Sequence, residues 1–128
     1  MEKNILVVDD EPQMRELLSE FFTNAGLTVF SAASGQEALD LLSNTQISVV
    51  ISDLAMPEMD GLELCRQVKK NNPIVVMIAL TGNWKFFEVT ECRSVGFDDY
   101  FRKPVDLAEL LECVNGCFSR MDRWFNVA

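Results

Sequence analysis

Short apolar runs alternate with helix-like segments along the whole of this 128-residue chain. The first run, Ile5–Val8, is continuously apolar, which is typical of a β-strand covered on both faces. Further strands are expected at residues 28–32, 47–52, 74–80 and 99–102. Strands that alternate with helices favour right-handed crossovers and a parallel sheet with helices on both faces. The sequence therefore predicts a single doubly wound α/β domain.

Turn and capping residues mark the ends of the helices between these strands. Pro12 lies at a favourable first-turn position, and Gly26 supplies a stop signal for the same helix. Ser34 and Asp106 each precede a Glu by three residues, the capping-box spacing at a helix N-terminus. Helices are expected from Pro12, from Ser34 through Leu42, at about residues 62–70 and 84–95, and from Asp106 onwards. We expect residues 1–120 to form the domain and residues 121–128 to form a helical extension or a frayed tail.

Acidic side chains dominate the charge, with 20 Asp and Glu against 11 Lys and Arg and a formal net charge of −9. Nucleic-acid surfaces normally carry a basic patch, so we expect a protein partner or a bound cation and no direct nucleic-acid contact. No apolar run approaches the roughly 18 residues that mark a membrane span, and the N-terminus shows no secretory pattern. The sequence thus predicts a cytoplasmic protein without membrane contact.

The chain contains no histidine. This excludes Ser-His-Asp and Cys-His catalysis, histidine metal ligands and a role as a phosphohistidine donor. Its four cysteines contain no C-x-x-C pair, so we expect reduced thiols packed in the core. They are Cys65, Cys92, Cys113 and Cys117.

Charged and hydroxyl side chains follow several expected strands at their carboxyl ends. They are Asp9 and Asp10, Asp53, Thr81 and Lys103. In an open parallel sheet these ends share one edge, and ligands bind in the crevice there. Three carboxylates, a hydroxyl and an ammonium would hold a divalent cation beside a phosphorylatable Asp. The predicted function is a phosphate-operated switch.

Four short motifs surround these side chains: VVDDE at residues 7–11, DLAMPEMDG at 53–61, LTG at 80–82 and KP at 103–104. With these motifs the chain resembles the receiver domain of bacterial two-component response regulators, and its length is similar to that of the single-domain chemotaxis type. Each is weak alone, but together they cover essentially the whole chain in order. The resemblance implies a flavodoxin-like (βα)5 sheet with strand order 2-1-3-4-5.

The resemblance also implies a phosphoacceptor and a metal site. Asp53 would accept the phosphoryl group, since aspartyl phosphate is an established covalent intermediate. Asp10, Asp53 and the Ala55 carbonyl would ligate Mg²⁺, with Asp9 nearby or acting through water. Mn²⁺ is the alternative ion.

Two further positions would handle the phosphoryl group. Thr81 would hydrogen-bond a phosphoryl oxygen. Lys103 would pair with the Asp53 carboxylate before transfer and with the phosphoryl group afterwards. In relatives the bond corresponding to Lys103–Pro104 is cis, which an X-Pro bond permits at low cost.

The resemblance places the output on the fourth helix, fifth strand and fifth helix. Tyr100 would turn inward when Thr81 moves toward the phosphoryl group. We expect Trp84, Phe86, Val89 and Tyr100 to border a surface for a partner or a second copy. The implied partners are a sensor histidine kinase or phosphotransfer protein as donor, and an output domain, an effector protein or a homodimer as readout.

Several other interpretations compete with this one. Asp10 and Thr81 could merely cap helices, Lys103 could be a surface charge, and Tyr100 could keep a fixed rotamer. A phosphatase of the haloacid dehalogenase type would need a second acid where Ala55 stands, and a dinucleotide site would need G-x-G-x-x-G after the first strand. A pseudo-receiver that only binds partners remains the alternative. A receiver would catalyse its own phosphorylation and dephosphorylation and would not act as an enzyme on a separate substrate.

Overall fold

The computed structural model describes residues 2–82 and 89–125. These residues form one sheet of five parallel strands in the order β2-β1-β3-β4-β5, which confirms the predicted topology. The strands are β1 (Asn4–Val8), β2 (Thr28–Ala32), β3 (Val49–Asp53), β4 (Val76–Thr81) and β5 (Asp99–Arg102). Every residue of β1 and β3 is buried, because both strands lie inside the sheet and both of their faces are covered. This position accounts for the continuous apolar runs in their sequences.

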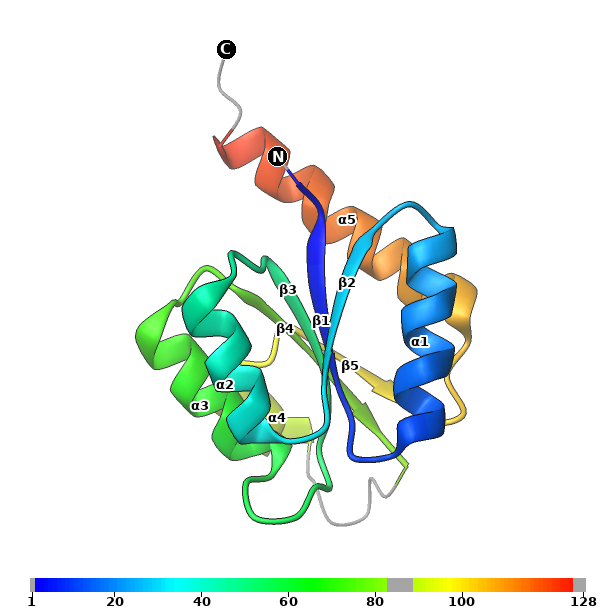
Figure 1. Ribbon diagram of the computed structural model, residues 1–128. Coiled ribbons are helices and arrows are strands. Elements are labelled where there is room, and N and C mark those ends of the chain that lie inside the picture. Colours follow the sequence, from blue (N-terminus) through cyan, green and yellow to red (C-terminus); the bar gives the residue numbers. More distant parts are fainter. Residues whose placement is uncertain (1, 83–88, 126–128) are drawn as a thin grey trace.

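In the described part of the chain, five helices cover the two faces of the sheet (Figure 1). They are α1 (Pro12–Asn24), α2 (Gly35–Asn44), α3 (Gly61–Asn71), α4 (Val89–Val95) and α5 (Leu107–Phe125). Helices α1 and α5 pack one apolar cluster against the sheet, whereas α2, α3 and α4 pack a second cluster against its other face. The doubly wound α/β prediction is confirmed. Within residues 2–82 and 89–125, no helix combines the length and the apolar character needed to cross a membrane.

Two strands begin later than the sequence analysis predicts. Strand β3 begins at Val49 and β4 at Val76, two residues after the expected starts. The register explains this, because Val49 pairs with Ile5 on one side and Val76 on the other. Ile74 precedes this ladder and is 65% exposed. An apolar residue next to a strand was therefore wrongly counted as part of it.

The chain ends are described unequally. Helix α5 continues through Phe125, so residues 121–125 are helical, and residues 126–128 lie outside the described part of the chain. The expected helix start near residue 84 also lies outside it, and α4 is described from Val89.

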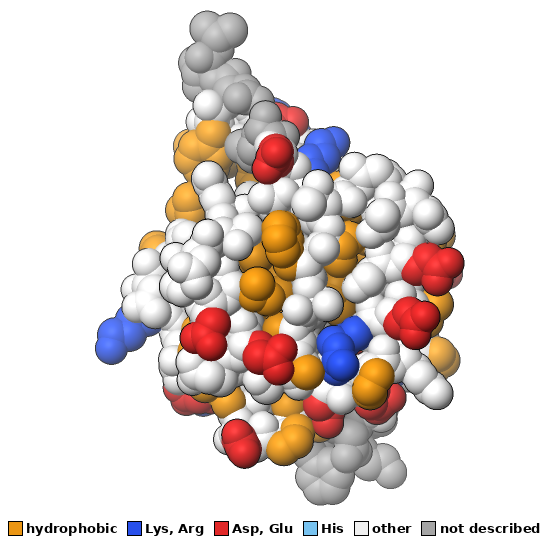
Figure 2. All heavy atoms as spheres, in the orientation of Figure 1, with side chains coloured by type: hydrophobic (Ala, Val, Ile, Leu, Met, Phe, Trp, Pro, Cys, Tyr) orange, Lys and Arg blue, Asp and Glu red, His pale blue; other side chains and the backbone are white. Residues whose placement is uncertain are grey.

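Over the face drawn in Figure 2, acidic side chains outnumber basic ones, in keeping with the net charge of −9.

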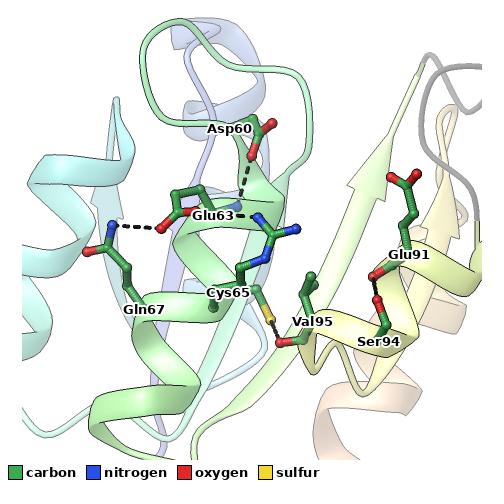
Figure 3. Close-up of polar contacts among 8 residues, drawn as sticks. Asp60, Glu63, Cys65, Gln67, Glu91, Ser94 and Val95 are labelled. Atoms are coloured by element: carbon green, nitrogen blue, oxygen red, sulfur yellow. Dashed lines mark hydrogen bonds and ion pairs between the residues drawn. The ribbon is translucent and has the colours of Figure 1, made fainter.

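Side-chain caps fix several helix starts. The Ser34 hydroxyl accepts a hydrogen bond from the backbone of Glu37 at 3.2 Å, and the Asp106 carboxylate accepts two backbone hydrogen bonds in the first turn of α5. Helix α3 has a similar cap, in which Asp60 accepts from the backbone of Glu63 at 2.9 Å (Figure 3). The sequence analysis missed this cap, although the same three-residue spacing was present.

The cysteines are all free thiols. Cys65, Cys92 and Cys117 are buried as expected, whereas Cys113 is half-buried. The Cys65 thiol donates to the Val95 carbonyl at 3.5 Å and so joins α3 to the end of α4 (Figure 3). Burial raises the pKa of Cys65 to about 12, which keeps this thiol protonated and able to donate.

Gly61 is needed where α3 starts beneath the end of β3. A Cβ at this position would overlap the Asp53 carbonyl oxygen and lie 2.9 Å from the Leu54 Cα. Both contacts are with backbone, so no side-chain rotation can relieve them. We expect Gly61→Ala to lower the free energy of unfolding by about 1–3 kcal/mol, measured by urea denaturation.

Gly116 in α5 provides the matched control, since an added Cβ there would meet nothing within 4 Å. Gly116→Ala is expected to raise the free energy of unfolding by roughly 0.5–1 kcal/mol, because alanine favours the helix. Equal urea midpoints for the two variants would contradict the steric role of Gly61.

Candidate functional site

The parallel register brings the predicted site residues to one edge of the sheet. Val8 pairs with Ser52, so Asp9 and Asp53 follow at neighbouring strand ends. On the other side of β3, Thr81 ends β4 and its carbonyl accepts a hydrogen bond from the Lys103 amide at 2.8 Å. These strand ends lie at the lower side of Figure 1, away from the N-terminus.

Three carboxylates form a compact cluster at this edge. Oxygen atoms of Asp9, Asp10 and Asp53 all lie within 4.8 Å of one another. Asp9 and Asp53 are buried, whereas Asp10 is exposed. No other group of three or more such ligands is found among the described residues. A set of hard oxygen donors at this spacing fits a divalent cation such as Mg²⁺.

Lys103 lies between two of these carboxylates. Its ammonium is 3.1 Å from Oδ2 of Asp9 and 3.6 Å from Oδ2 of Asp53. Burial alone would lower the pKa of Lys103, but the hydrogen bond to Asp9 and the charge of Asp53 raise it above the usual value. The ammonium therefore remains charged and offsets part of the negative charge of the cluster.

Asp53 carries a raised pKa. Burial is the main cause, and it raises the pKa from 3.8 to about 6. The negative charge of Asp9 also raises it, whereas Lys103 and the backbone amides of Leu54 and Ala55 lower it. The ionised Asp53 carboxylate therefore destabilises the folded protein, and a bound cation would reduce this destabilisation.

Asp9 has hydrogen-bond partners that the sequence analysis did not identify. Its Oδ1 accepts from the Glu11 amide at 2.9 Å, and its backbone carbonyl accepts from the Arg15 guanidinium at 2.7 Å. The Arg15 contact joins α1 to the end of β1. No local sequence signal distinguishes this arginine from a surface charge.

The expected switch and surface residues are placed in part. Thr81 is buried, and Tyr100 is half-buried with a hydroxyl that has no hydrogen-bond partner among the described residues. Val89 is 49% exposed. Trp84 and Phe86 lie outside the described residues.

Two backbone features flank the site. The Lys103–Pro104 peptide bond is cis. Ala55 is exposed in the loop after β3, where Glu58 has a φ of 68°, and the loop ends at the α3 cap. The loop that carries Ala55 therefore runs from the end of β3 at Asp53 to the Asp60 cap of α3.

A family model described as the response regulator receiver domain matches residues 5–115. The chain belongs to this family. Its fold class and the class of its function follow: it is a receiver domain, a phosphoacceptor switch of two-component signalling. Receiver domains are signalling proteins and not classical enzymes, and sensor kinases and output effectors are the usual partners of response regulators.

Longer relatives share this receiver domain. The chain is 40% identical over 111 residues to the response regulator MprA of Mycobacterium sp. (strain KMS), covering 87% of this chain and 48% of MprA. It is 31% identical over 121 residues to the response regulator SaeR of Staphylococcus aureus (strain USA300), covering 94% of this chain and 53% of SaeR. The chain therefore spans about half the length of the curated relatives it matches.

Solved receiver structures match over nearly their full length. A receiver domain from Clostridium thermocellum is 30% identical with a TM-score of 0.89, covering 96% of this chain and 99% of that one. The response regulator TrrA of Thermotoga maritima, solved in complex with Mg²⁺–BeF, is 34% identical with a TM-score of 0.82, covering 90% and 98%. Both confirm that this receiver domain has the family fold.

Proposed function

We propose that this receiver domain takes a phosphoryl group onto the Asp53 carboxylate in a Mg²⁺-dependent reaction. The observation that carries the proposal is the position of Asp53, which shares a carboxylate cluster with Asp9 and Asp10 and lies 3.6 Å from the Lys103 ammonium. A pseudo-receiver usually lacks one of these groups. Their joint presence favours a phosphoacceptor over a pure interaction module.

In this proposal Asp10, Asp53 and the Ala55 carbonyl hold the Mg²⁺ ion, and Asp9 acts through water. The donors are all hard oxygen atoms, which suit an octahedral ion that also keeps some waters. The Mg²⁺–BeF complex of TrrA supports the same choice of ion. Mn²⁺ would accept the same donors. When bound, the ion neutralises charge on the carboxylates and on the phosphoryl oxygens.

The chemistry asked of Asp53 is nucleophilic attack by one carboxylate oxygen on the phosphorus of the donor. The bond from phosphorus to the donor breaks, and its electron pair leaves with the donor. With a pKa of about 6, Asp53 is mainly ionised at neutral pH and is available for attack. Positioning and charge neutralisation supply most of the catalysis in such transfers.

Lys103 and Thr81 would then bind the transferred group. The Lys103 ammonium already lies 3.6 Å from Asp53, and after transfer it would pair with the phosphoryl oxygens in place of the carboxylate. The Thr81 hydroxyl, at the end of the next strand, would hydrogen-bond another phosphoryl oxygen. These groups would let the domain speed both its own phosphorylation and its own dephosphorylation, without turning over a separate substrate.

The proposed readout is a change of the surface formed by α4, β5 and α5. Movement of Thr81 toward the phosphoryl group would be coupled to the rotamer of Tyr100. The buried hydroxyl of Tyr100 supports this, because it has no hydrogen-bond partner within residues 2–82 and 89–125 that would stabilise its present rotamer. Val89, which is 49% exposed, would border this surface.

The partners proposed for this chain follow from this cycle. The donor would be the phosphohistidine of a sensor kinase or of a phosphotransfer protein, because sensor kinases are usual partners of response regulators. The readout would be an output domain, an effector protein or a homodimer through α4, β5 and α5. We place the cycle in the cytoplasm, where response regulators typically work.

The direct test uses acetyl phosphate as a small phosphodonor. In the presence of Mg²⁺, intact mass spectrometry is expected to show a gain of one phosphoryl group. The same incubation with excess EDTA is expected to show none, because the carboxylates then repel the incoming phosphate. No gain with Mg²⁺ would favour the pseudo-receiver, and an equal gain in EDTA would contradict the metal dependence.

A further inference from the structure

Asp9 is hydrogen-bonded through every polar group it has. Its amide donates to the Ala32 carbonyl at 3.2 Å, and its two carboxylate oxygens accept from the Glu11 amide and from Lys103. Its backbone carbonyl accepts from the Arg15 guanidinium at 2.7 Å. Asp9 is thus a fixed point at the end of β1.

The contact with Arg15 is the one that bears on Asp10. Arg15 is half-buried near the start of α1, and its side chain reaches back across the loop to the Asp9 carbonyl. A distance of 2.7 Å from a charged donor marks a strong, charge-assisted hydrogen bond. Among the described residues Arg15 makes no ion pair, and its guanidinium donates to the Asp9 carbonyl.

The carbonyl of Asp9 belongs to the planar peptide unit that joins Asp9 to Asp10. Because the unit is planar, fixing the direction of its oxygen also fixes the amide and the Cα of Asp10. Asp10 is exposed, and its carboxylate has no hydrogen-bond donor among the described residues. Its place in the cluster therefore depends on its backbone.

We propose that Arg15 is a positioning residue for the cation site: by holding the Asp9 carbonyl, it presents the Asp10 carboxylate to the cluster with Asp9 and Asp53. The inference rests on the proposed function, since it takes Mg²⁺ as the ion. It adds a residue outside the carboxylate cluster on which Mg²⁺ affinity depends.

The direction in which Arg15→Met changes the Mg²⁺ affinity distinguishes a positioning role of Arg15 from a purely electrostatic one. The positive charge of Arg15 repels a dication, so a purely electrostatic role means that Arg15→Met tightens Mg²⁺ binding. A positioning role means that the same change weakens binding, because Asp10 is no longer held in place. Methionine keeps most of the apolar stem, so the packing of α1 is largely preserved.

The experiment is a calorimetric Mg²⁺ titration of the full chain. We expect Arg15→Met to raise the Kd about 10-fold or more, as is usual for groups that orient metal ligands. Arg15→Lys, which keeps a donor, is expected between Arg15→Met and the wild type. Arg66→Met is the matched control, because Arg66 is an exposed arginine on α3 that contacts Glu63 at 3.4 Å, and its Kd should not change.

Each outcome decides the inference. An unchanged or tighter Kd for Arg15→Met overturns it, as does a weaker affinity for Arg15→Lys than for Arg15→Met. Urea denaturation without Mg²⁺ checks that the variant is folded, and Arg15→Gln replaces Arg15→Met if it is not. If the wild type binds Mg²⁺ and Arg15→Met matches it, only this inference fails. If the wild type binds no Mg²⁺, the proposed function fails and the inference falls with it.

Discussion

Asp53→Asn is expected to abolish phosphoryl uptake from acetyl phosphate under conditions in which the wild type gains one phosphoryl group. The amide has nearly the shape of the carboxylate but no nucleophilic oxygen, so the covalent step is lost while the fold is kept. Asp9 and Asp10 remain, but both follow β1, whereas Asp53 ends β3. Intact mass spectrometry at several times of incubation measures the uptake.

Asp60→Asn is the matched control for this loss. Asp60 caps α3 through a backbone hydrogen bond at 2.9 Å, and asparagine caps helices about as well as aspartate. Uptake by Asp60→Asn is expected to equal that of the wild type. Uptake by Asp53→Asn would show that the phosphoryl group goes to another residue, and equal loss in both variants would show that the loss is not specific to Asp53.

The same Asp53→Asn change is expected to stabilise the protein when no Mg²⁺ is present. Burial raises the pKa of Asp53 from 3.8 to about 6, so the folded state carries an ionised carboxylate at a cost. At about 1.4 kcal/mol per unit of pKa, the cost approaches 3 kcal/mol at pH 8. Asparagine carries no charge and avoids it. We expect a gain of about 2 kcal/mol in the free energy of unfolding, measured by urea denaturation in EDTA.

The pH dependence of this gain has a defined sign. Because folding raises the pKa, the folded state binds the proton more tightly than the unfolded state does. The wild type therefore loses stability as pH rises through about 6, whereas below about 3.8 Asp53 is protonated in both states and its burial carries no charge penalty. The difference between Asp53→Asn and the wild type should stay nearly constant above about pH 7 and shrink between about pH 6 and pH 4. A difference that grows toward low pH, or no difference at pH 8, would contradict the burial of an ionised Asp53.

Much of the fold was predictable because local and long-range signals agree. The continuous apolar run of Ile5–Val8 indicated a central strand, and β1 is buried along its whole length. The capping spacings at Ser34 and Asp106 located two helix starts within one residue. In a parallel sheet the strand ends share an edge, so Asp9 and Asp53 were expected to meet once the strands were known.

Other features depend on packing that a sequence does not record. The resemblance paired Lys103 with Asp53, yet its ammonium lies nearer to Asp9, at 3.1 Å against 3.6 Å. The raised pKa of Asp53 comes mainly from burial. The hydrogen bond from Arg15 to the Asp9 carbonyl depends on how α1 packs beside the end of β1. None of these follows from residue type and spacing.

The central claim is that one carboxylate among the 20 acidic residues, Asp53, becomes an acyl phosphate. Borohydride reduces an acyl phosphate to an alcohol, which would convert a phosphorylated Asp53 into homoserine and release phosphate. After incubation with acetyl phosphate and Mg²⁺, borohydride treatment and peptide mass mapping should therefore find homoserine at position 53 alone. Homoserine at another Asp, or none in a sample that gained a phosphoryl group, would contradict the account.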